Sequence, residues 1–184
     1  MAASRKPGDG AGKPAPSTLS HDEQLAAARN AALRLLAVRE RSAMELRTRL
    51  RQKGFHADVI VSVLDRLQET KLQDDARFGA QFVEAATRRG KAGRRIQMEL
   101  RARGLSKEEA ARAATEDPES ERARARDLAG RKAARMGDLP VETRVRRLLS
   151  LLARKGFDPD TCRIVAKEAA GSASLDPLVE RDLP

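Results

Sequence analysis

The sequence predicts an all-α protein of three tandem three-helix repeats that form an elongated, curved helical array. The first observation is a pattern that recurs around three glycines, Gly54, Gly104 and Gly156. Bulky apolar residues stand eight and four positions before each glycine, a basic residue stands directly before it, and Phe or Leu follows it. The second observation is that capping signals and apolar residues at helical spacing recur in the same order around these glycines.

Each of the three glycines is expected to end a helix. Glycine is favoured just beyond a helix because it accepts a left-handed backbone at no steric cost. The basic residue before it suits the negative end of the helix dipole. We interpret the glycines as structural, one in each repeat. Replacing any of them with a β-branched residue is expected to harm folding before function.

The first module is expected at 21–70, after a disordered basic tail at 1–20 that holds almost nothing to bury. Its helices are a long one at about 22–38, a short one that stops at Gly54, and a short one at about 58–69. Two of them begin with capping boxes, in which a Ser side chain caps the helix and a Glu three residues later reaches back. The boxes are Ser20/Glu23 and Ser42/Glu45.

The second module is expected at 71–116 and follows the same order of helices. Asp74 and Asp75 open its long helix, because carboxylates stabilise the positive helix N-terminus. Its second helix follows Gly93 and ends at Gly104. A third capping box, Ser106/Glu109, opens its last helix.

The third module is expected at 117–170, with a tail at 171–184. Its long helix covers 119–135 despite a weak apolar stripe, and a loop follows at 136–140. Its two short helices are expected at about 142–155 and 159–169. Asp158 caps the second of these, with proline at the first helical position.

The composition indicates an anionic partner. The net charge is +10, and the 37 basic residues include 28 arginines, so nucleic acid is the first candidate. The chain has four Phe and no Trp or Tyr, which disfavours platforms that stack single-stranded bases. No apolar run is long enough to span a bilayer, and no signal peptide is visible. We therefore expect a soluble cytoplasmic monomer that makes no contact with membrane.

The residues that commonly carry catalysis are too few and too dispersed. His21 and His56 are 35 positions apart, and neither is near the single cysteine, Cys162. A metal site needs several such ligands together, so no metal, cofactor or catalytic residue is expected. Cys162 occupies an inward position typical of a core thiol, and His56 has the position of a helix cap or a solvated side chain.

Basic residues gather at the glycine-ended helices of the second and third modules. A solvated face is one interpretation, and a shared contact with an anion is the other. The first cluster is Arg88, Arg89, Lys91, Arg94, Arg95, Arg101 and Arg103. The candidates in the second cluster are Arg144, Arg146, Arg147, Arg154 and Lys155.

Five motifs in order resemble the RecX family of RecA regulators, over about Ala27 to Glu168. They are the segments 39–46, 53–55, 72–78, 96–105 and 152–157, which include Lys53-Gly54-Phe55, Arg103-Gly104-Leu105 and Lys155-Gly156-Phe157. The chain departs from the family pattern in having Phe or Ala at positions that are often Tyr, and in its polar segment 119–135.

The resemblance implies three tandem three-helix repeats that bind in the helical groove of the RecA–DNA filament. It also implies contact with the single-stranded DNA inside that filament. The expected role is non-enzymatic: limiting filament growth or promoting filament loss, and so damping recombination, ATP hydrolysis and coprotease activity.

Two other functions remain as alternatives. One is a basic helical DNA-binding protein, such as a transcription regulator that acts independently of RecA, because short helix pairs invite comparison with helix-turn-helix proteins. Against it, the helices after the glycines present apolar residues instead of polar base-reading ones. The other alternative is an enzyme, for which no acid–base or metal constellation is present.

Overall fold

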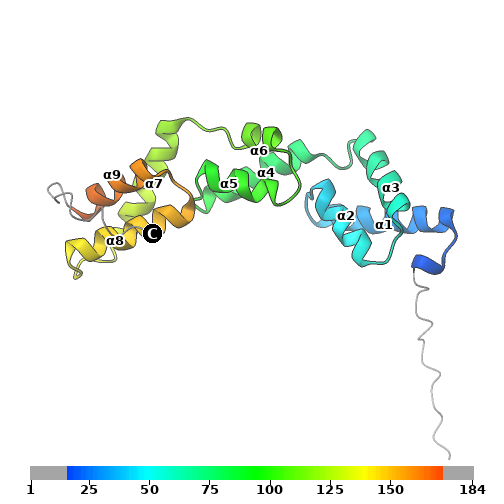
Figure 1. The fold of residues 1–184 in the computed structure, drawn as a ribbon, viewed down its shortest axis with the longest axis horizontal. Helices are drawn as coiled ribbons and strands as arrows, with labels where there is room; N and C mark the ends of the chain where they lie inside the picture. The colour runs from blue at the N-terminus through cyan, green and yellow to red at the C-terminus, as the bar shows by residue number, and fades with distance from the viewer. Residues whose placement is uncertain (1–15, 172–184) are drawn as a thin grey trace, which may run out of the picture. The chain divides into compact units, whose positions relative to one another are not determined.

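The computed structural model describes residues 16–171, which form nine α-helices and one short 3-10 helix, with no strand in that range. This confirms the all-α class (Figure 1). The helices are α1 (His21–Val38), α2 (Ala43–Gln52), α3 (Ala57–Glu69), α4 (Asp75–Arg88), α5 (Gly93–Arg101), α6 (Lys107–Ala113), α7 (Pro118–Ala133), α8 (Val141–Lys155) and α9 (Pro159–Ala170). The expected tail at 171–184 lies outside the described residues from position 172 onward, as do residues 1–15.

The helix starts follow the capping residues of the sequence. Ser20 and Ser106 form complete capping boxes with Glu23 and Glu109. The Ser42 hydroxyl accepts a hydrogen bond from the backbone N–H of Glu45 at 3.0 Å. In module 3 the caps are carboxylates, Asp117 for α7 and Asp158 for α9, and each is followed by proline at the start of its helix.

The repeated glycine pattern is a Schellman turn after the second helix of each module. Gly54, Gly104 and Gly156 have φ values of 87°, 98° and 92°, which confirms the left-handed conformation. In each turn the residue after the glycine donates its N–H to the carbonyl of the leucine four residues before the glycine. These bonds, Phe55 to Leu50, Leu105 to Leu100 and Phe157 to Leu152, are all 3.3 Å long.

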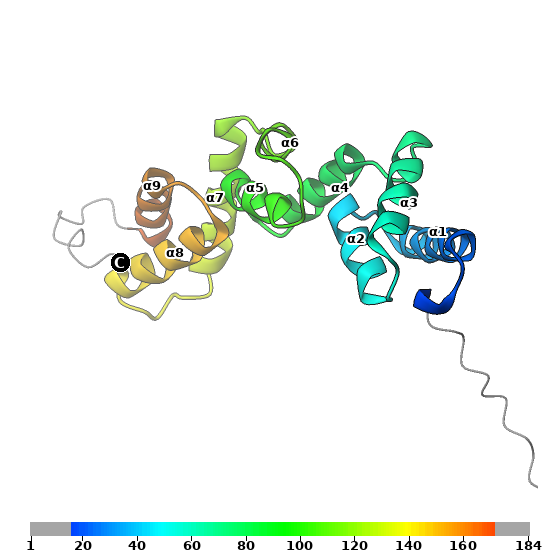
Figure 2. The same cartoon turned by 45° about the vertical axis from the view of Figure 1, so that its right-hand side comes forward.

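Each group of three helices encloses its own apolar cluster, so we call α1–α3, α4–α6 and α7–α9 modules 1, 2 and 3 (Figures 1 and 2). The third helix of each group packs against both of the others. The centres of the clusters are the leucine and isoleucine pairs of the second helices, which are at most 1% exposed. These pairs are Leu46/Leu50, Ile96/Leu100 and Leu148/Leu152.

The chain divides into two compact units, one up to Asp74 and one from Asp75 onward. The first holds module 1, and the second holds modules 2 and 3. The curvature of the whole array therefore stays a prediction.

The described structure begins at residue 16, inside the segment 1–20 that was expected to be a tail. Pro16–Thr18 form a 3-10 helix. The side chain of Gln24 is buried, and its amide donates to the Leu19 carbonyl at 3.1 Å. Its oxygen also accepts from the N–H of His56 at 3.5 Å. The segment has few apolar residues, so its sequence did not indicate this structure. The contact that holds it is made by the polar side chain of Gln24.

Hydrogen bonds join the turn between α4 and α5 to module 3. The N–H of Ala92 donates to the Lys155 carbonyl at 2.9 Å, and the Lys155 ammonium donates to the Arg89 carbonyl at 2.6 Å. From α7, the Glu121 carboxylate accepts from the N–H of Gly93 at 2.6 Å. These bonds tie backbone groups of module 2 to the end of α8 and the first turn of α7.

Gly156 is also a point of close approach between the two modules. A Cβ atom at this position would lie 2.4 Å from the Cβ of Arg95 on α5. By contrast, a Cβ at Gly54 would meet only Pro16, at 3.9 Å. Gly156 therefore has a second structural role that its place in the repeat did not reveal.

We predict that Gly156→Ala destabilises the second unit more than Gly171→Ala does. Gly171 also has a positive φ, 74°, but no atom of residues 16–171 lies within 4 Å of a Cβ there. A left-handed alanine costs about 1–2 kcal/mol, and the contact with Arg95 adds about 1–3 kcal/mol of overpacking. Urea unfolding followed by circular dichroism measures both losses.

Gly130→Ala is the control for the loss of a glycine as such. Gly130 lies inside α7, and nothing is within 4 Å of a Cβ there. The change is expected to raise the unfolding free energy by about 0.5–1 kcal/mol, because alanine is the better helix former. Equal destabilisation by Gly156→Ala and Gly171→Ala would contradict the role given to the Arg95 contact.

Candidate functional site

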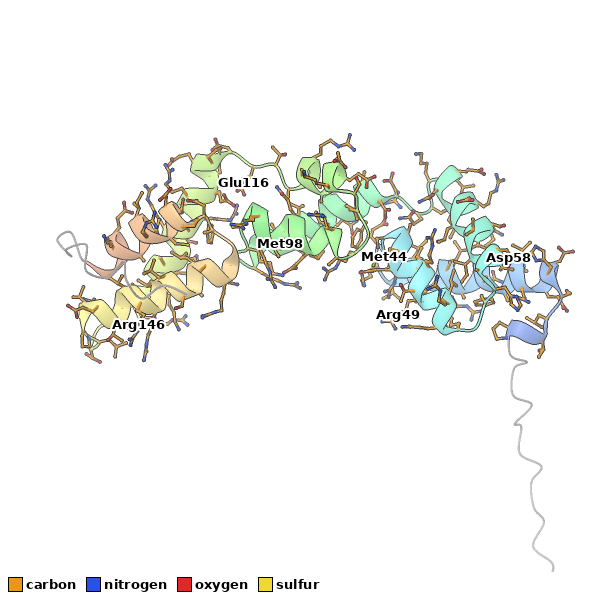
Figure 3. All side chains as sticks on the ribbon, viewed as in Figure 1. Met44, Arg49, Asp58, Met98, Glu116 and Arg146 are labelled. Atoms are coloured by element: carbon orange, nitrogen blue, oxygen red, sulfur yellow. The ribbon has the colours of Figure 1, made fainter. Side chains whose placement is uncertain are left out.

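The surplus of positive charge lies largely on the second helix of each module. On α2 the charges are Arg47, Arg49 and Arg51 against Glu45; on α5, Arg94, Arg95 and Arg101 against Glu99; on α8, Arg144, Arg146, Arg147, Arg154 and Lys155 against Glu142. The third helices carry no such surplus. α3 has three carboxylates and one arginine, and α6 and α9 have two charges of each sign. Figure 3 shows Arg49 and Arg146 standing out from the ribbons of α2 and α8.

The basic face of α2 was missed in the sequence analysis. Arg47, Arg49 and Arg51 are exposed and precede Gly54 as the first cluster precedes Gly104. The signal was available, because the three arginines occupy a helix whose equivalent in the other modules was already recognised as basic. These arginines were overlooked because α2 carries fewer basic residues than either of the two predicted clusters.

Lys91 and Arg95 of the first predicted cluster form intramolecular ion pairs with Glu99. Glu99 accepts from the Lys91 ammonium at 2.6 Å and from Nε of Arg95 at 2.9 Å. Burial raises the pKa of Glu99, but the hydrogen bonds from Lys91 and Arg95 outweigh it, so the pKa lies below its ordinary value. Glu99 is therefore ionised at neutral pH and offsets part of the charge of α5.

Other predicted residues have intramolecular partners as well. Arg88 pairs with Glu84 on the exposed face of α4. The Arg103 guanidinium lies over the Phe82 ring, 4.5 Å from its centroid, and donates to the Glu99 carbonyl at 2.8 Å. The Lys155 ammonium donates to the Arg89 carbonyl in the α4–α5 turn of module 2. We therefore assign Arg103 and Lys155 structural roles.

The remaining candidates have guanidinium groups without polar partners among residues 16–171. Arg144 differs from the rest, because it is half-buried and its Nε atom is buried without a hydrogen bond. The others are fully exposed, and their side chains are available to an anion. They are Arg89, Arg94, Arg101, Arg146, Arg147 and Arg154.

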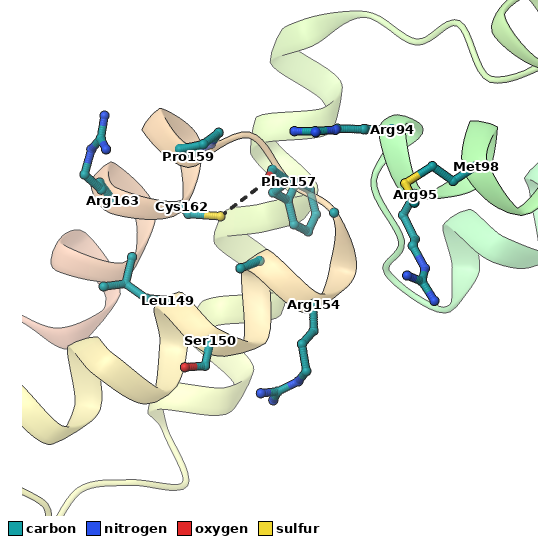
Figure 4. Close-up of a pocket in the computed structure, with 12 residues that line it drawn as sticks. Arg94, Arg95, Met98, Leu149, Ser150, Arg154, Phe157, Pro159, Cys162 and Arg163 are labelled. Atoms are coloured by element: carbon teal, nitrogen blue, oxygen red, sulfur yellow. Dashed lines mark hydrogen bonds between the residues drawn. The ribbon is translucent and has the colours of Figure 1, made fainter. Parts of the chain in front are cut away.

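A groove of about 930 Å³ lies between module 2 and module 3 (Figure 4). It brings together Arg94 and Arg95 of the first predicted cluster with Arg154 of the second. Arg101, Arg146 and Arg147 do not line it. Its other walls are Met98 from α5, Leu149, Ser150 and Ala153 from α8, the turn at Gly156 and Phe157, and Pro159, Cys162 and Arg163 from α9.

Sequence reasoning did not find Met98 or Arg163. Met98 lies on a helix that was singled out for its charge and for its buried apolar pair, and Arg163 lies on a helix whose two basic and two acidic residues balance. Arg163 and Arg94 line the same groove because Gly156 lets the end of α8 approach α5. Only the packing of the two modules reveals this.

Cys162 is the buried core thiol that its position predicts. It is 4% exposed, and its Sγ donates to the Phe157 carbonyl at 3.6 Å. Burial raises the pKa of the thiol to about 11, and the nearby Asp158 charge adds to the effect. A thiol with this pKa is almost entirely protonated at neutral pH and is a poor nucleophile.

Both histidines belong to module 1, whereas modules 2 and 3 line the groove. His56 is the N-cap residue of α3, but its side chain makes no capping bond and is exposed. His21 lies 3.5 Å from Asp58, with both side chains open to solvent. Across the described part of the chain, no three His, Cys, Asp or Glu side chains gather as a metal site would require. Nor does any helix there have the length and apolar character needed to cross a bilayer.

Comparison with known proteins gives consistent similarities. Residues 28–67 match the model of the first three-helix domain of RecX, and residues 74–113 match that of the second. The regulatory protein RecX of Amycolatopsis mediterranei is 37% identical over 171 residues, which cover 89% of this chain and 98% of the relative. That of Thermobifida fusca is 36% identical over 180 residues, covering 96% of this chain and 94% of the relative.

The fold is similar to that of solved proteins at lower sequence identity. The crystal structure of RecX from Lactobacillus salivarius aligns with a TM-score of 0.71 and 21% identity. The alignment covers 80% of this chain and 97% of that one.

We predict that Cys162 resists alkylation in the folded protein. Raising the thiol pKa from 9.0 to about 11 lowers the thiolate fraction about 100-fold at pH 8, and burial adds a barrier to access. Iodoacetamide labelling followed by mass spectrometry is expected to be at least 100-fold slower in buffer than in guanidinium chloride. Similar rates in both would show that the thiol is accessible and reactive.

Proposed function

Since this chain belongs to the RecX family of regulatory proteins, we propose that it binds RecA–DNA filaments and mainly inhibits RecA. The protein occupies the helical groove of the filament and contacts the single-stranded DNA within it. Occupation of the groove limits filament growth or promotes filament loss. Recombination, ATP hydrolysis and coprotease activity fall as a result. The protein acts in the cytoplasm as a monomer without catalysis or cofactor.

The observation that carries this proposal is the basic second helix of all three modules. A phosphate backbone presents negative charge at regular intervals, and arginines bind it without reading its sequence. α2, α5 and α8 are in equivalent places, and each exposes arginines. A repeat protein whose repeats share one charged helix is suited to a partner whose charges also repeat.

The structure favours this function over sequence-specific DNA binding without RecA. A recognition helix needs an exposed face that approaches the DNA. α3 instead buries its apolar face, and its exposed side chains include Asp58, Asp65 and Glu69, which repel phosphates. The equivalent helices α6 and α9 have no net positive charge.

We predict that the protein lowers the rate of ATP hydrolysis by RecA on single-stranded DNA. The measurement is a titration of the protein into preformed filaments, with filament length followed in parallel by electron microscopy. We expect hydrolysis and filament length to fall together as the protein approaches equimolarity with RecA. An unchanged rate at equimolar protein would rule out the proposed function.

We further predict that the exposed arginines outside the groove contribute to DNA binding. The variant Arg101→Glu/Arg146→Glu/Arg147→Glu is expected to bind an oligo-dT strand at least 10-fold more weakly. The slope of log affinity against log salt is expected to fall by about 2, since each contact with a single-strand phosphate contributes about 0.7. Arg88 and Arg95 are left unchanged because they pair with Glu84 and Glu99.

The matched control is Arg29→Glu/Arg34→Glu/Arg112→Glu, which changes the net charge by the same amount on α1 and α6. These three arginines are exposed and lie outside the basic second helices. Both variants are expected to keep the helicity of the wild type by circular dichroism. Equal weakening by the two variants would show that net charge, and not its placement on second helices, governs binding.

A further inference from the structure

We propose that the groove between α5, α8 and α9 is a binding site for an acidic peptide segment of a partner protein, with an apolar residue as its anchor. The groove is lined by cationic side chains and by apolar side chains. Figure 4 shows Arg94 and Arg154 on the two sides of the groove and Met98 on the α5 side. A peptide that alternates carboxylates with an apolar side chain matches both kinds of side chain.

Two of the cationic side chains that line the groove are free to bind carboxylates. Arg94 and Arg154 are exposed and have no polar partner among residues 16–171, whereas Arg95 and Arg163 pair with Glu99 and Asp160. A guanidinium binds a carboxylate through two parallel hydrogen bonds, which adds geometric specificity to the charge attraction. Arg94 and Arg154 therefore supply two such positions, one from each module.

The apolar residues that line the groove favour a peptide over nucleic acid. Met98 is 57% exposed, and Leu149, Ala153 and Pro159 line the same groove. Single-stranded bases bind by stacking on exposed aromatic rings, but the only ring here, Phe157, is 4% exposed. Methionine is flexible and adapts to different apolar side chains, so it suits an anchoring leucine or phenylalanine of a peptide.

The groove is formed before any ligand arrives. Its two sides are held by the bond from Ala92 to Lys155, the bond from Lys155 to Arg89, and the close approach of Gly156 to Arg95. A site that needs no rearrangement loses less affinity to ordering. Its volume of about 930 Å³ is within the range of known ligand pockets. The inference rests on the proposed function only in taking a protein partner as the source of the peptide.

The first experiment uses two fluorescein-labelled dodecapeptides. Both contain eight glutamates and two glycines, and they differ in having either two leucines or two serines at the centre. Fluorescence anisotropy with the full chain is expected to show at least 10-fold tighter binding of the leucine peptide. At 0.5 M salt the leucine peptide is expected to keep measurable binding, because burial of its anchor is not screened. Equal affinity of the two peptides would overturn the proposal and leave only an anionic surface.

Substitutions locate the binding site. Met98→Gln removes the apolar contact without changing charge, and we expect it to weaken the leucine peptide at least 5-fold and leave the serine peptide unaffected. Met44→Gln is the matched control, since Met44 is 47% exposed on α2 and remote in sequence from the groove. Arg94→Ala/Arg154→Ala is expected to weaken both peptides at least 10-fold, whereas Arg34→Ala/Arg112→Ala leaves them unchanged. Loss of binding in the control variants would overturn the assignment to this groove.

Competition with oligo-dT tests the nucleic-acid alternative. If oligo-dT displaces the leucine peptide and its own affinity falls in Met98→Gln, the groove binds nucleic acid and the proposal is wrong. If oligo-dT binds equally well to Met98→Gln and wild type, the peptide site is supported. All these measurements omit RecA, so an absence of RecA inhibition would refute the proposed function without affecting the result for the peptide.

Discussion

The left-handed glycine after each second helix is the constraint on which the rest of the structure depends. It reverses the chain so that the next residue, Phe or Leu, donates to a leucine carbonyl and enters the same apolar cluster as that leucine. The turn thus delivers the third helix onto the first two. Any other residue would have to adopt this backbone conformation at a cost of about 1–2 kcal/mol, a large share of the stability of a small module.

Charge placement follows from this geometry. The second helix buries one apolar stripe, so its opposite side remains exposed and can carry arginine at little cost. In module 1 the third helix, α3, buries five apolar residues, and its charged positions hold three carboxylates and one arginine. On each second helix the buried apolar residues face the core and the exposed arginines face outward. The proposed contact with an anion and the core therefore use opposite faces of the same helix.

Local signals were enough to predict the helices, because capping boxes, helix-terminal glycines and apolar spacing act over a few residues. The helix ends lie close to the expected positions, and Cys162 is buried as its position relative to Gly156 indicated. The candidate site was only partly predictable. Charge alone could not separate the free Arg94 from Lys155, whose ammonium closes a turn 66 residues away in sequence. Nor could it reveal Met98 and Arg163 as neighbours, since that depends on how one module meets the next.

The bonds that join the α4–α5 turn to the end of α8 also determine how the second unit responds to heat or denaturant. The backbone N–H groups of Ala92 and Gly93 in module 2 donate to the Lys155 carbonyl and the Glu121 carboxylate in module 3, so neither module can open without exposing polar groups of the other. These bonds couple the unfolding of the two modules. Module 1 has its own cluster and its own compact unit, and can unfold independently. A ligand spanning α5 and α8 would raise the melting temperature of the larger unit alone, so calorimetry would identify the half of the chain that holds it.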